Sequence, residues 1–337
     1  MRGKREALTR IAAGIGFTRL LESMPKRPIL TILNYHRIGN ALDTPYDSGT
    51  FSATALEFDW QIDYLKRRYR VLTLQEALAL TAGAKLTEPA VLITFDDGYI
   101  DNYQVAFPVL RRHGAQAVFF LPTAFIGAER IPWWDVIAYV VKRSKTTRIS
   151  LSYPENKIFD LERDGERRTI MLILRLYKQP AMQDHDRFLE DLERACESSR
   201  PRADAQRCFL NWDEAREMTR HGMAFGSHTH SHELLSKLSA ERQQDELARS
   251  REIIERELRV NIDTLAYPVG ARHTFTPTTV EMARKTGYRA AFSFYGGFNK
   301  PGTIQPFDIC RQGIDGQSLP RFRLQTSLGY ATARHWF

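Results

Sequence analysis

The chain has 337 residues, of which 43% are hydrophobic and 26% are charged, and its formal net charge is +8. This composition excludes a disordered or fibrous chain and predicts a folded protein with a sizeable core. The length fits either two domains or one α/β barrel with additions.

The first predicted element is a basic amphipathic extension over residues 1–27. Residues 1–30 carry seven Lys or Arg against Glu6 and Glu22. The apolar run at 11–21 is interrupted by Arg19, shows no convincing cleavage pattern, and is shorter than the roughly 20 residues that span a bilayer. We therefore expect a cytoplasmic protein whose basic end is solvated or touches the anionic inner face of the membrane. No nucleic-acid motif accompanies this charge, so we expect no nucleic-acid partner.

Five short apolar runs predict buried strands, at residues 28–36, 90–95, 116–121, 263–268 and 289–294. Between them, residues 58–68, 103–114 and 239–259 carry apolar side chains at helical spacing. Strands separated by helices predict parallel pairing through right-handed crossovers, so the fold class is α/β. Gly114 and Gly287 each follow a predicted helix and precede a strand, and Ser239 is an N-cap candidate.

The middle of the chain breaks this alternation. Residues 143–207 are highly charged and show no strand pattern as strong as those on either side. We expect a helical insertion of two or three helices here, within one domain over residues 28–337. The three cysteines, Cys196, Cys208 and Cys310, have no CxxC spacing, which argues against a disulfide framework and a thiolate zinc site.

Two adjacent carboxylates, Asp96 and Asp97, end the apolar run VLITFDDGY at residues 91–99. Gly98 permits the sharp turn that follows. In α/β barrels, sites are built where a parallel strand meets its following loop. The pair is either a solvated acidic turn or the mouth of a site, and the turn alone does not decide between them.

Three histidines lie within GSHTHSH, at residues 226–232. His228 and His232 are four apart, which on a helical turn places both imidazoles on one face, whereas His230 could pair with a neighbour on an extended chain. Two imidazoles and one carboxylate leave coordination positions open, as in catalytic metal sites. Asp97 would be that carboxylate, and Asp96 would act beside the ion as a general base.

The motifs TFDDGY, HTHSH and AYPVG, in this order, resemble the polysaccharide deacetylase family, also called the NodB-homology or carbohydrate esterase 4 group. The resemblance covers most of residues 28–312 and includes NYHRIG and the WD of NWDEAREM. It implies a distorted (β/α) barrel of about seven parallel strands that removes acetyl groups from N-acetylated sugars with Zn²⁺, or with Co²⁺, Ni²⁺ or Fe²⁺. Asp96 matches the catalytic base, and Asp97, His228 and His232 match the metal ligands.

Other features of the family find partial matches. The main-chain N–H that completes the oxyanion hole would belong to Val269. Ala266 stands where the family often has an arginine, and Arg311 is a candidate to supply the guanidinium. No late Leu-x-x-His motif is clear, so the proton donor is left open between His36, His273 and a second role for Asp96. These departures resemble a branch with a YHRI first strand and YPxG, often associated with extracellular polysaccharide or glycolipid synthesis.

The resulting hypothesis is a metal-dependent hydrolase of non-peptide carbon–nitrogen bonds that deacetylates N-acetylated sugar units of a polysaccharide or lipid-linked glycan. The alternatives are a catalytically silent carbohydrate-binding barrel and a hydrolase of another small amide or O-acetyl ester. The side chains predicted to contact substrate are Tyr99, Trp133, Trp134, Tyr267 and Pro268. For the tryptophans, packing in a core is the competing reading.

Overall fold

The computed structural model describes residues 28–202, 207–314 and 318–328, so the predicted extension at 1–27 lies outside the described residues. The chain divides into two compact units. The first comprises the described parts of Met1–Gly39, Phe51–Ile126 and Phe209–Phe337, and the second comprises Asn40–Thr50 and Gly127–Cys208.

The first unit is built on one sheet whose recorded strand pairs are all parallel. The strands are β1 (Leu30–Tyr35), β4 (Arg70–Val71), β5 (Ala90–Asp96), β6 (Val118–Leu121), β9 (Ala224–Ser227), β10 (Thr264–Ala266), β11 (Ala290–Ser293), β12 (Ile309–Cys310) and β13 (Gln312–Gly313). Their order is β12-β11-β10-β9-β6-β5-β1-β13, and β4 also pairs with β5. All five predicted strands are present.

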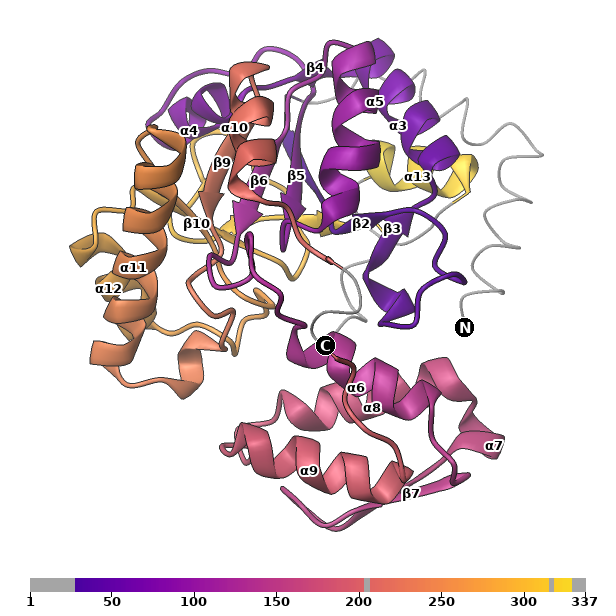
Figure 1. Cartoon of the computed structure of the whole chain (residues 1–337). Coiled ribbons are helices and arrows are strands. Elements are labelled where there is room, and N and C mark those ends of the chain that lie inside the picture. Colours follow the sequence, from indigo (N-terminus) through magenta and orange to yellow (C-terminus); the bar gives the residue numbers. More distant parts are fainter. Residues whose placement is uncertain (1–27, 203–206, 315–317, 329–337) are drawn as a thin grey trace. The chain divides into compact units, whose positions relative to one another are not determined.

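The two ends of this strand order lie in a single short segment. β12 pairs with β11, β13 pairs with β1, and only Arg311 separates β12 from β13. The chain itself therefore joins the two edges of the sheet, which gives it a nearly closed, barrel-like form (Figure 1). The predicted distorted (β/α) barrel is confirmed, with nine strands in the sheet instead of about seven.

Helices cover the outside of this sheet in Figure 1. They are α3 (Ala55–Arg68), α4 (Leu74–Thr81), the π-helical turn η2 (Asn102–Ala106) with α5 (Phe107–Arg112), α10 (Trp212–Arg220), η4 (Leu235–Lys237), α11 (Ala240–Leu258), α12 (Pro277–Lys285) and α13 (Leu319–Leu328). Ser239 caps α11 as predicted, since its hydroxyl accepts the backbone N–H of Arg242. Gly114 and Gly287 follow α5 and α12 with positive φ, as the sequence predicts. No helix within the described ranges is long and apolar enough to cross a bilayer.

Buried apolar side chains of strands and helices form the core of this unit. Leu92, Phe120 and Phe292, from three different strands, are each 0% exposed and belong to one cluster with residues of α4. Strands buried on both faces explain why their sequences are continuous apolar runs. A small parallel pair, β2 (Arg37–Ile38) with β3 (Phe51–Ala53), lies outside the main sheet.

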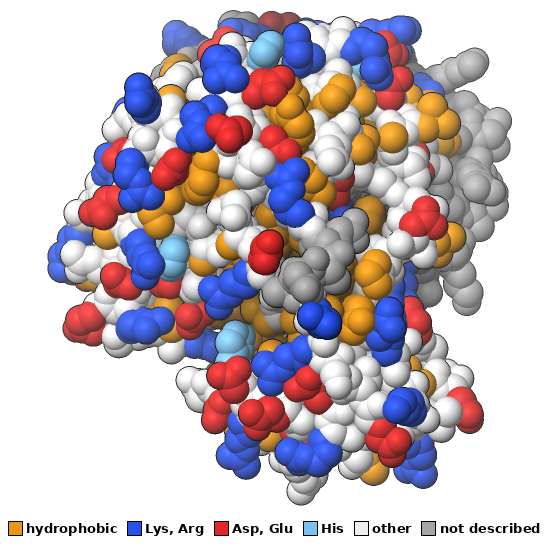
Figure 2. All heavy atoms as spheres, in the orientation of Figure 1, with side chains coloured by type: hydrophobic (Ala, Val, Ile, Leu, Met, Phe, Trp, Pro, Cys, Tyr) orange, Lys and Arg blue, Asp and Glu red, His pale blue; other side chains and the backbone are white. Residues whose placement is uncertain are grey.

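The second unit is mainly helical. It contains η1 (Ser48–Thr50), α6 (Trp133–Lys142), α7 (Leu161–Asp164), α8 (Glu166–Tyr177) and α9 (His185–Cys196), together with an antiparallel pair, β7 (Arg148–Leu151) and β8 (Lys157–Asp160). This unit begins earlier than the insertion expected at 143–207, and it adds a hairpin to the expected helices. The hairpin strands are short and half exposed, which explains their weak sequence signal. Figure 2 shows acidic and basic side chains interspersed on the visible face.

Candidate metal centre

The turn after β5 separates the two adjacent carboxylates. Asp96 is the last residue of the strand, and Asp97 and Gly98 follow with φ of 72° and 68°. Aspartate tolerates this left-handed conformation better than most residues, and glycine adopts it freely. A Cβ at Gly98 would lie 2.7 Å from Leu121 Cδ2, so close packing also requires glycine here. The two carboxylates share His228 as a neighbour, but Asp97 also faces His232 whereas Asp96 is bound by Arg311.

Asp97 faces both histidines of the predicted ligand set. Its Oδ1 lies 3.6 Å from His228 Nε2 and 3.4 Å from His232 Nε2. The three side chains are buried, and one ligand atom from each lies within 4.8 Å of the others. Asp96 ends β5 and His228 directly follows β9. β6 lies between these two strands and pairs with both in parallel, so Asp96 and His228 come to the same end of the sheet.

The imidazole of His228 is prepared for coordination. Its Nδ1 lies 2.7 Å from the carbonyl oxygen of Ala266, which can only accept a hydrogen bond, so Nδ1 carries the proton and Nε2 keeps its lone pair. Burial lowers the pKa of His228, which favours the neutral ring that a metal needs. His230, the alternative partner, places Nδ1 2.8 Å from the hydroxyl of Thr123.

The donor spacing fits a divalent ion. A tetrahedral ion with bonds of about 2.0–2.1 Å to nitrogen and oxygen needs ligand atoms roughly 3.3 Å apart. The two distances that join Asp97 to the histidines, 3.4 and 3.6 Å, approach this value. Two imidazole nitrogens and one carboxylate oxygen suit zinc and several other first-row ions, and they leave coordination positions for water and substrate.

Asp96 is held by a different set of partners. Its Oδ1 accepts a hydrogen bond of 2.7 Å from Arg311 Nη1, and its Oδ2 accepts bonds of 2.8 Å from Arg311 Nη2 and 2.9 Å from Asn34 Nδ2. Burial raises the pKa of the Asp96 carboxyl, but the Arg311 guanidinium and nearby imidazoles lower it by more, so this pKa lies well below its usual value. The carboxylate is therefore ionised at neutral pH.

Arg311 reaches Asp96 from the segment that joins the two edges of the sheet. Its side chain is 0% exposed, and its Nε also donates to the Ser293 carbonyl at 3.2 Å. The structure thus brings the guanidinium of Arg311 to the acid predicted as the base. Ala266, which stands where an arginine was expected, contributes its carbonyl to His228 instead.

Asn34 is a site residue that sequence reasoning missed. Its Nδ2 donates to Asp96, and its Oδ1 accepts from Arg311 Nη1 at 2.9 Å. The residue lies on β1 opposite Thr94, whose hydroxyl is 2.8 Å from the same Oδ1. Asn34, Thr94 and Asp96 share one side of adjacent strands, so an asparagine inside the first apolar run was the available signal.

Replacing Arg311 by methionine is expected to leave the buried Asp96 carboxylate without its ionic partner. Loss of one member of a buried pair typically lowers the free energy of unfolding by about 3–5 kcal/mol. The pKa of Asp96 should rise, because burial then acts without the guanidinium, so activity should be lost at a higher pH on the acid side. Denaturant unfolding and a pH profile of kcat/KM check both effects.

The exposed Arg256, which pairs with Glu257 on the surface of α11, provides the control Arg256→Met. Surface pairs contribute about 0–1 kcal/mol, so this change should leave stability and the pH profile nearly unaltered. An Arg311→Met protein with wild-type stability and an unshifted acid limb would contradict the role given to this ion pair.

Val269 occupies a strained turn after β10. The Gly270 N–H donates to the Pro268 carbonyl at 2.7 Å, which closes a three-residue turn around Val269 with φ of 63°. Positive φ is a genuine outlier for a β-branched residue. No hydrogen bond from the Val269 N–H is recorded among the described residues, and its role at an oxyanion stays a prediction.

His36 lies one residue beyond β1. Tyr35 of β1 lies opposite Phe95 of β5. The next residues along the two chains, His36 and Asp96, are therefore level with each other. When protonated, the His36 imidazole helps to lower the pKa of Asp96, after the larger effect of Arg311, and its ring contacts Phe294 with centroids 5.7 Å apart. His36 is therefore close to the base.

The side chains predicted to contact substrate are buried in packing environments. Tyr99 is 0% exposed and stacks on Phe209, and Tyr267 is 0% exposed and donates from its hydroxyl to the Phe307 carbonyl. Pro268, between Tyr267 and Val269, is also buried. Their contact with substrate stays a prediction. Neither tyrosine ring is exposed to solvent in this structure.

The two tryptophans belong to the second unit and start α6. Trp133 is 7% exposed and stacks on Tyr177 with centroids 4.1 Å apart, and Trp134 is 6% exposed and meets Trp133 edge to face. These contacts are those of core residues, which is the competing reading of the pair. Their predicted contact with sugar stays a prediction.

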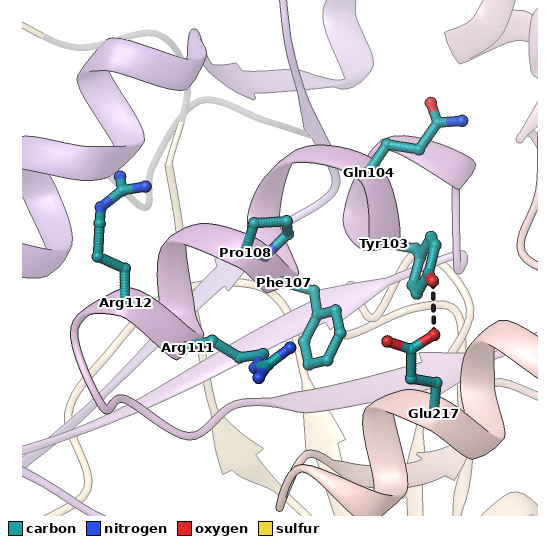
Figure 3. Close-up of a pocket in the computed structure, with 7 residues that line it drawn as sticks. All are labelled: Tyr103, Gln104, Phe107, Pro108, Arg111, Arg112 and Glu217. Atoms are coloured by element: carbon teal, nitrogen blue, oxygen red, sulfur yellow. Dashed lines mark hydrogen bonds between the residues drawn. The ribbon is translucent and has the colours of Figure 1, made fainter.

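A separate cavity of about 490 Å³ lies on the flank of the first unit (Figure 3). It is lined by Tyr103, Gln104, Phe107, Pro108, Arg111, Arg112 and Glu217. The Tyr103 hydroxyl donates to Glu217 Oε2 at 2.6 Å across this cavity. None of the candidate site residues lines it, so the cavity is distinct from the metal centre.

Comparisons with known proteins place this arrangement in a family. A family sequence model described as polysaccharide deacetylase matches residues 83–156 and 173–291. YxkH of Bacillus subtilis, assigned to the polysaccharide deacetylases, is 27% identical over 264 residues, which cover 77% of this chain and 62% of that protein. A poly-beta-1,6-N-acetyl-D-glucosamine N-deacetylase of Staphylococcus aureus is 29% identical over 116 residues, or 32% of this chain and 40% of that protein. The chain thus spans less than two thirds of these relatives.

Solved structures share the fold. The deacetylase PplD of Streptococcus pyogenes superposes with a TM-score of 0.58 at 20% identity, covering 89% of this chain and 98% of that one. IcaB of Ammonifex degensii gives a TM-score of 0.55 at 20% identity, with coverage of 92% and 100%. With the family model matching more than half of its residues, this chain belongs to the polysaccharide deacetylase family.

Proposed function

We propose that this protein is a metal-dependent hydrolase that removes acetyl groups from N-acetylated sugar units of a polysaccharide or lipid-linked glycan. The proposal rests on one observation: the two adjacent acids have different partners, which suit one to bind a metal ion and the other to act as a base. Asp97 lies with His228 and His232 in a set that fits a divalent ion. Asp96 lies beside this set, with its Oδ2 3.8 Å from His228 Nε2, and both of its oxygens accept hydrogen bonds from Arg311 or Asn34. The named activity of the Staphylococcus aureus relative supports an N-acetylglucosamine polymer as the substrate class.

The site residues can perform the hydrolysis in two proton transfers. A divalent ion held by Asp97, His228 and His232, with zinc as the first candidate, would supply Lewis-acid polarisation of the acetyl carbonyl and acidify a water molecule. Asp96 accepts the proton of that water as its oxygen bonds to the carbonyl carbon. The Val269 N–H donates to the oxyanion that develops. A proton delivered to the amide nitrogen then lets the C–N bond break, which yields acetate and an amino sugar.

The direct test is acetate release from β-1,6-linked N-acetylglucosamine oligomers, with β-1,4-linked oligomers and O-acetylated sugars in parallel. We expect release from an N-acetylated oligomer, its loss after treatment with a chelator, and its return with added zinc. Tight glycan binding without acetate release would favour the silent carbohydrate-binding barrel. Release from O-acetylated sugars alone would favour an esterase.

His36 is the proposed donor of the proton to the leaving amine, because its position next to Asp96 in the register brings it close to the base. His36→Gln should lower kcat by about 10²–10⁴-fold, the usual contribution of a general acid, and should remove the alkaline limb of the kcat profile. Steady-state kinetics across pH check this. The exposed ring of His273 gives the matched variant His273→Gln, which should behave like wild type. The reverse result would transfer the role to His273.

A further inference from the structure

The segment that links the two histidine ligands has an unfavourable backbone. Thr229 and His232 adopt φ of 65° and 58°, although neither is glycine. Such conformations cost of order 1–3 kcal/mol each and persist where surrounding contacts fix them. Because this segment determines how His232 is aimed relative to His228, the contacts that fix it also determine the geometry of the ligand set.

Those contacts converge on Glu246, a residue of α11. The N–H groups of His230 and Ser231 donate to its Oε2 at 3.0 and 2.7 Å, and the Ser231 hydroxyl donates to its Oε1 at 2.7 Å. The Glu246 side chain is 3% exposed. Both carboxylate oxygens are thus used to hold the two residues just before His232.

The same face of α11 also holds the start of the segment. The Ser250 hydroxyl, one turn after Glu246, lies 2.8 Å from the Ser227 hydroxyl, which accepts the N–H of Thr229 at 3.1 Å. The N–H of His232 in turn donates to the Thr229 hydroxyl at 3.1 Å. The helix therefore supports the histidine segment at two points, and Glu246 contributes the only formal charge among them.

The charge of Glu246 has no ionic partner among the described residues, where no ion pair with Lys, Arg or His is recorded for it. A buried carboxylate is costly unless hydrogen bonds and a compensating charge stabilise it. Three neutral donors provide the hydrogen bonds. A divalent ion held by the neighbouring histidines would provide positive charge, so the carboxylate and the ion stabilise each other.

We infer that Glu246 is a positioning residue that raises metal affinity by fixing the backbone between His228 and His232. This inference rests on the metal centre of the proposed function and assigns to it a residue that touches neither ion nor substrate. The sequence contains no signal for this role, because a glutamate in a charged amphipathic helix is usually solvated.

The experiment measures zinc affinity in Glu246→Gln by competition with a chromophoric chelator. Glutamine can turn its oxygen to the two N–H groups and its NH2 to the Ser231 hydroxyl, but it removes the negative charge. The three hydrogen bonds then lose their charge assistance, so the segment should be held less firmly. Mutation of a residue that holds a metal ligand in place without touching the metal lowers metal affinity by about 10–100-fold. Saturating zinc should restore kcat with KM unchanged, which a general structural defect would not allow. Glu252→Gln, an exposed change on the same helix, should bind zinc like wild type.

Ser231→Ala provides a milder variant should Glu246→Gln fail to fold. It removes the hydroxyl that donates to Glu246 Oε1 at 2.7 Å and also lies 3.1 Å from Glu233 Oε1. Zinc binding should weaken by about fivefold, in line with the usual contribution of one hydrogen bond. Wild-type zinc affinity in folded Glu246→Gln or, failing that, in Ser231→Ala would overturn the inference and leave the proposed function intact. A wild-type protein that binds no zinc would overturn the metal centre and this inference together.

Discussion

Asp96→Asn is expected to retain one bound zinc ion per chain while kcat falls by about 10²–10⁴-fold, the contribution typical of a general base. The amide cannot accept the proton of the attacking water. Zinc should remain because Asp96 is held by Arg311 and Asn34, whereas Asp97 lies with the histidines. Acetate release and zinc content per chain, measured on the same sample, check the two halves of this result.

The variant also breaks the buried ion pair with Arg311, so its stability must be measured beside its activity. Asp63→Asn is the matched control, because Asp63 is an exposed member of a helical pair with Arg67 and its loss should cost little. A folded Asp96→Asn protein with wild-type kcat would exclude this residue as the base.

Asp97→Asn, one position further along, is expected to have the opposite effect on the metal. Mutation of a residue that only holds a ligand in place lowers metal affinity by up to about 100-fold. Loss of the anionic ligand itself should lower zinc affinity by more than this, and activity should fall with it. Asparagine tolerates the left-handed conformation of Asp97, so the turn should survive. Zinc competition assays and activity at rising zinc concentrations give the measurement.

Together, the two variants show which of the adjacent carboxylates is the metal ligand and which is the general base. If Asp97→Asn kept its zinc and Asp96→Asn lost it, the assignment of ligand and base would have to be reversed. If both kept zinc, the histidines alone would account for binding, and Asp97 would not be a ligand.

The strands and the ends of the helices could be predicted from the sequence because their signals are local. The run that ends at Asp96 is apolar throughout, since β5 is buried at every position. Ser239 and Gly114 mark helix boundaries through short-range hydrogen bonds and positive φ. The close approach of Asp97 to both histidines could also be predicted, because both motifs follow strands of a parallel sheet and so lie at the same end of it.

Arg311 could be named as a candidate from the sequence, but its bonds to Asp96 and Asn34 could not be predicted, because these contacts join distant parts of the chain. Arg311 donates to Asn34, which lies 277 positions away in the sequence. No local sequence pattern predicts that these two residues meet. The segment that carries Arg311 joins the sheet edges with strands of two residues, too short for a periodic signal. The hairpin of the second unit was missed for a similar reason, since its strands have four residues each.

The central claim is that Asp97, His228 and His232 bind one divalent ion, and a zinc-edge anomalous diffraction map of crystals loaded with zinc tests it most directly. We predict a single strong peak about 2.0–2.2 Å from the Nε2 atoms of both histidines and from a carboxylate oxygen of Asp97. Asp96 should keep its contact with Arg311 and lie outside bonding distance. A peak elsewhere, or zinc-loaded crystals in which these three side chains bind no metal, would contradict the account.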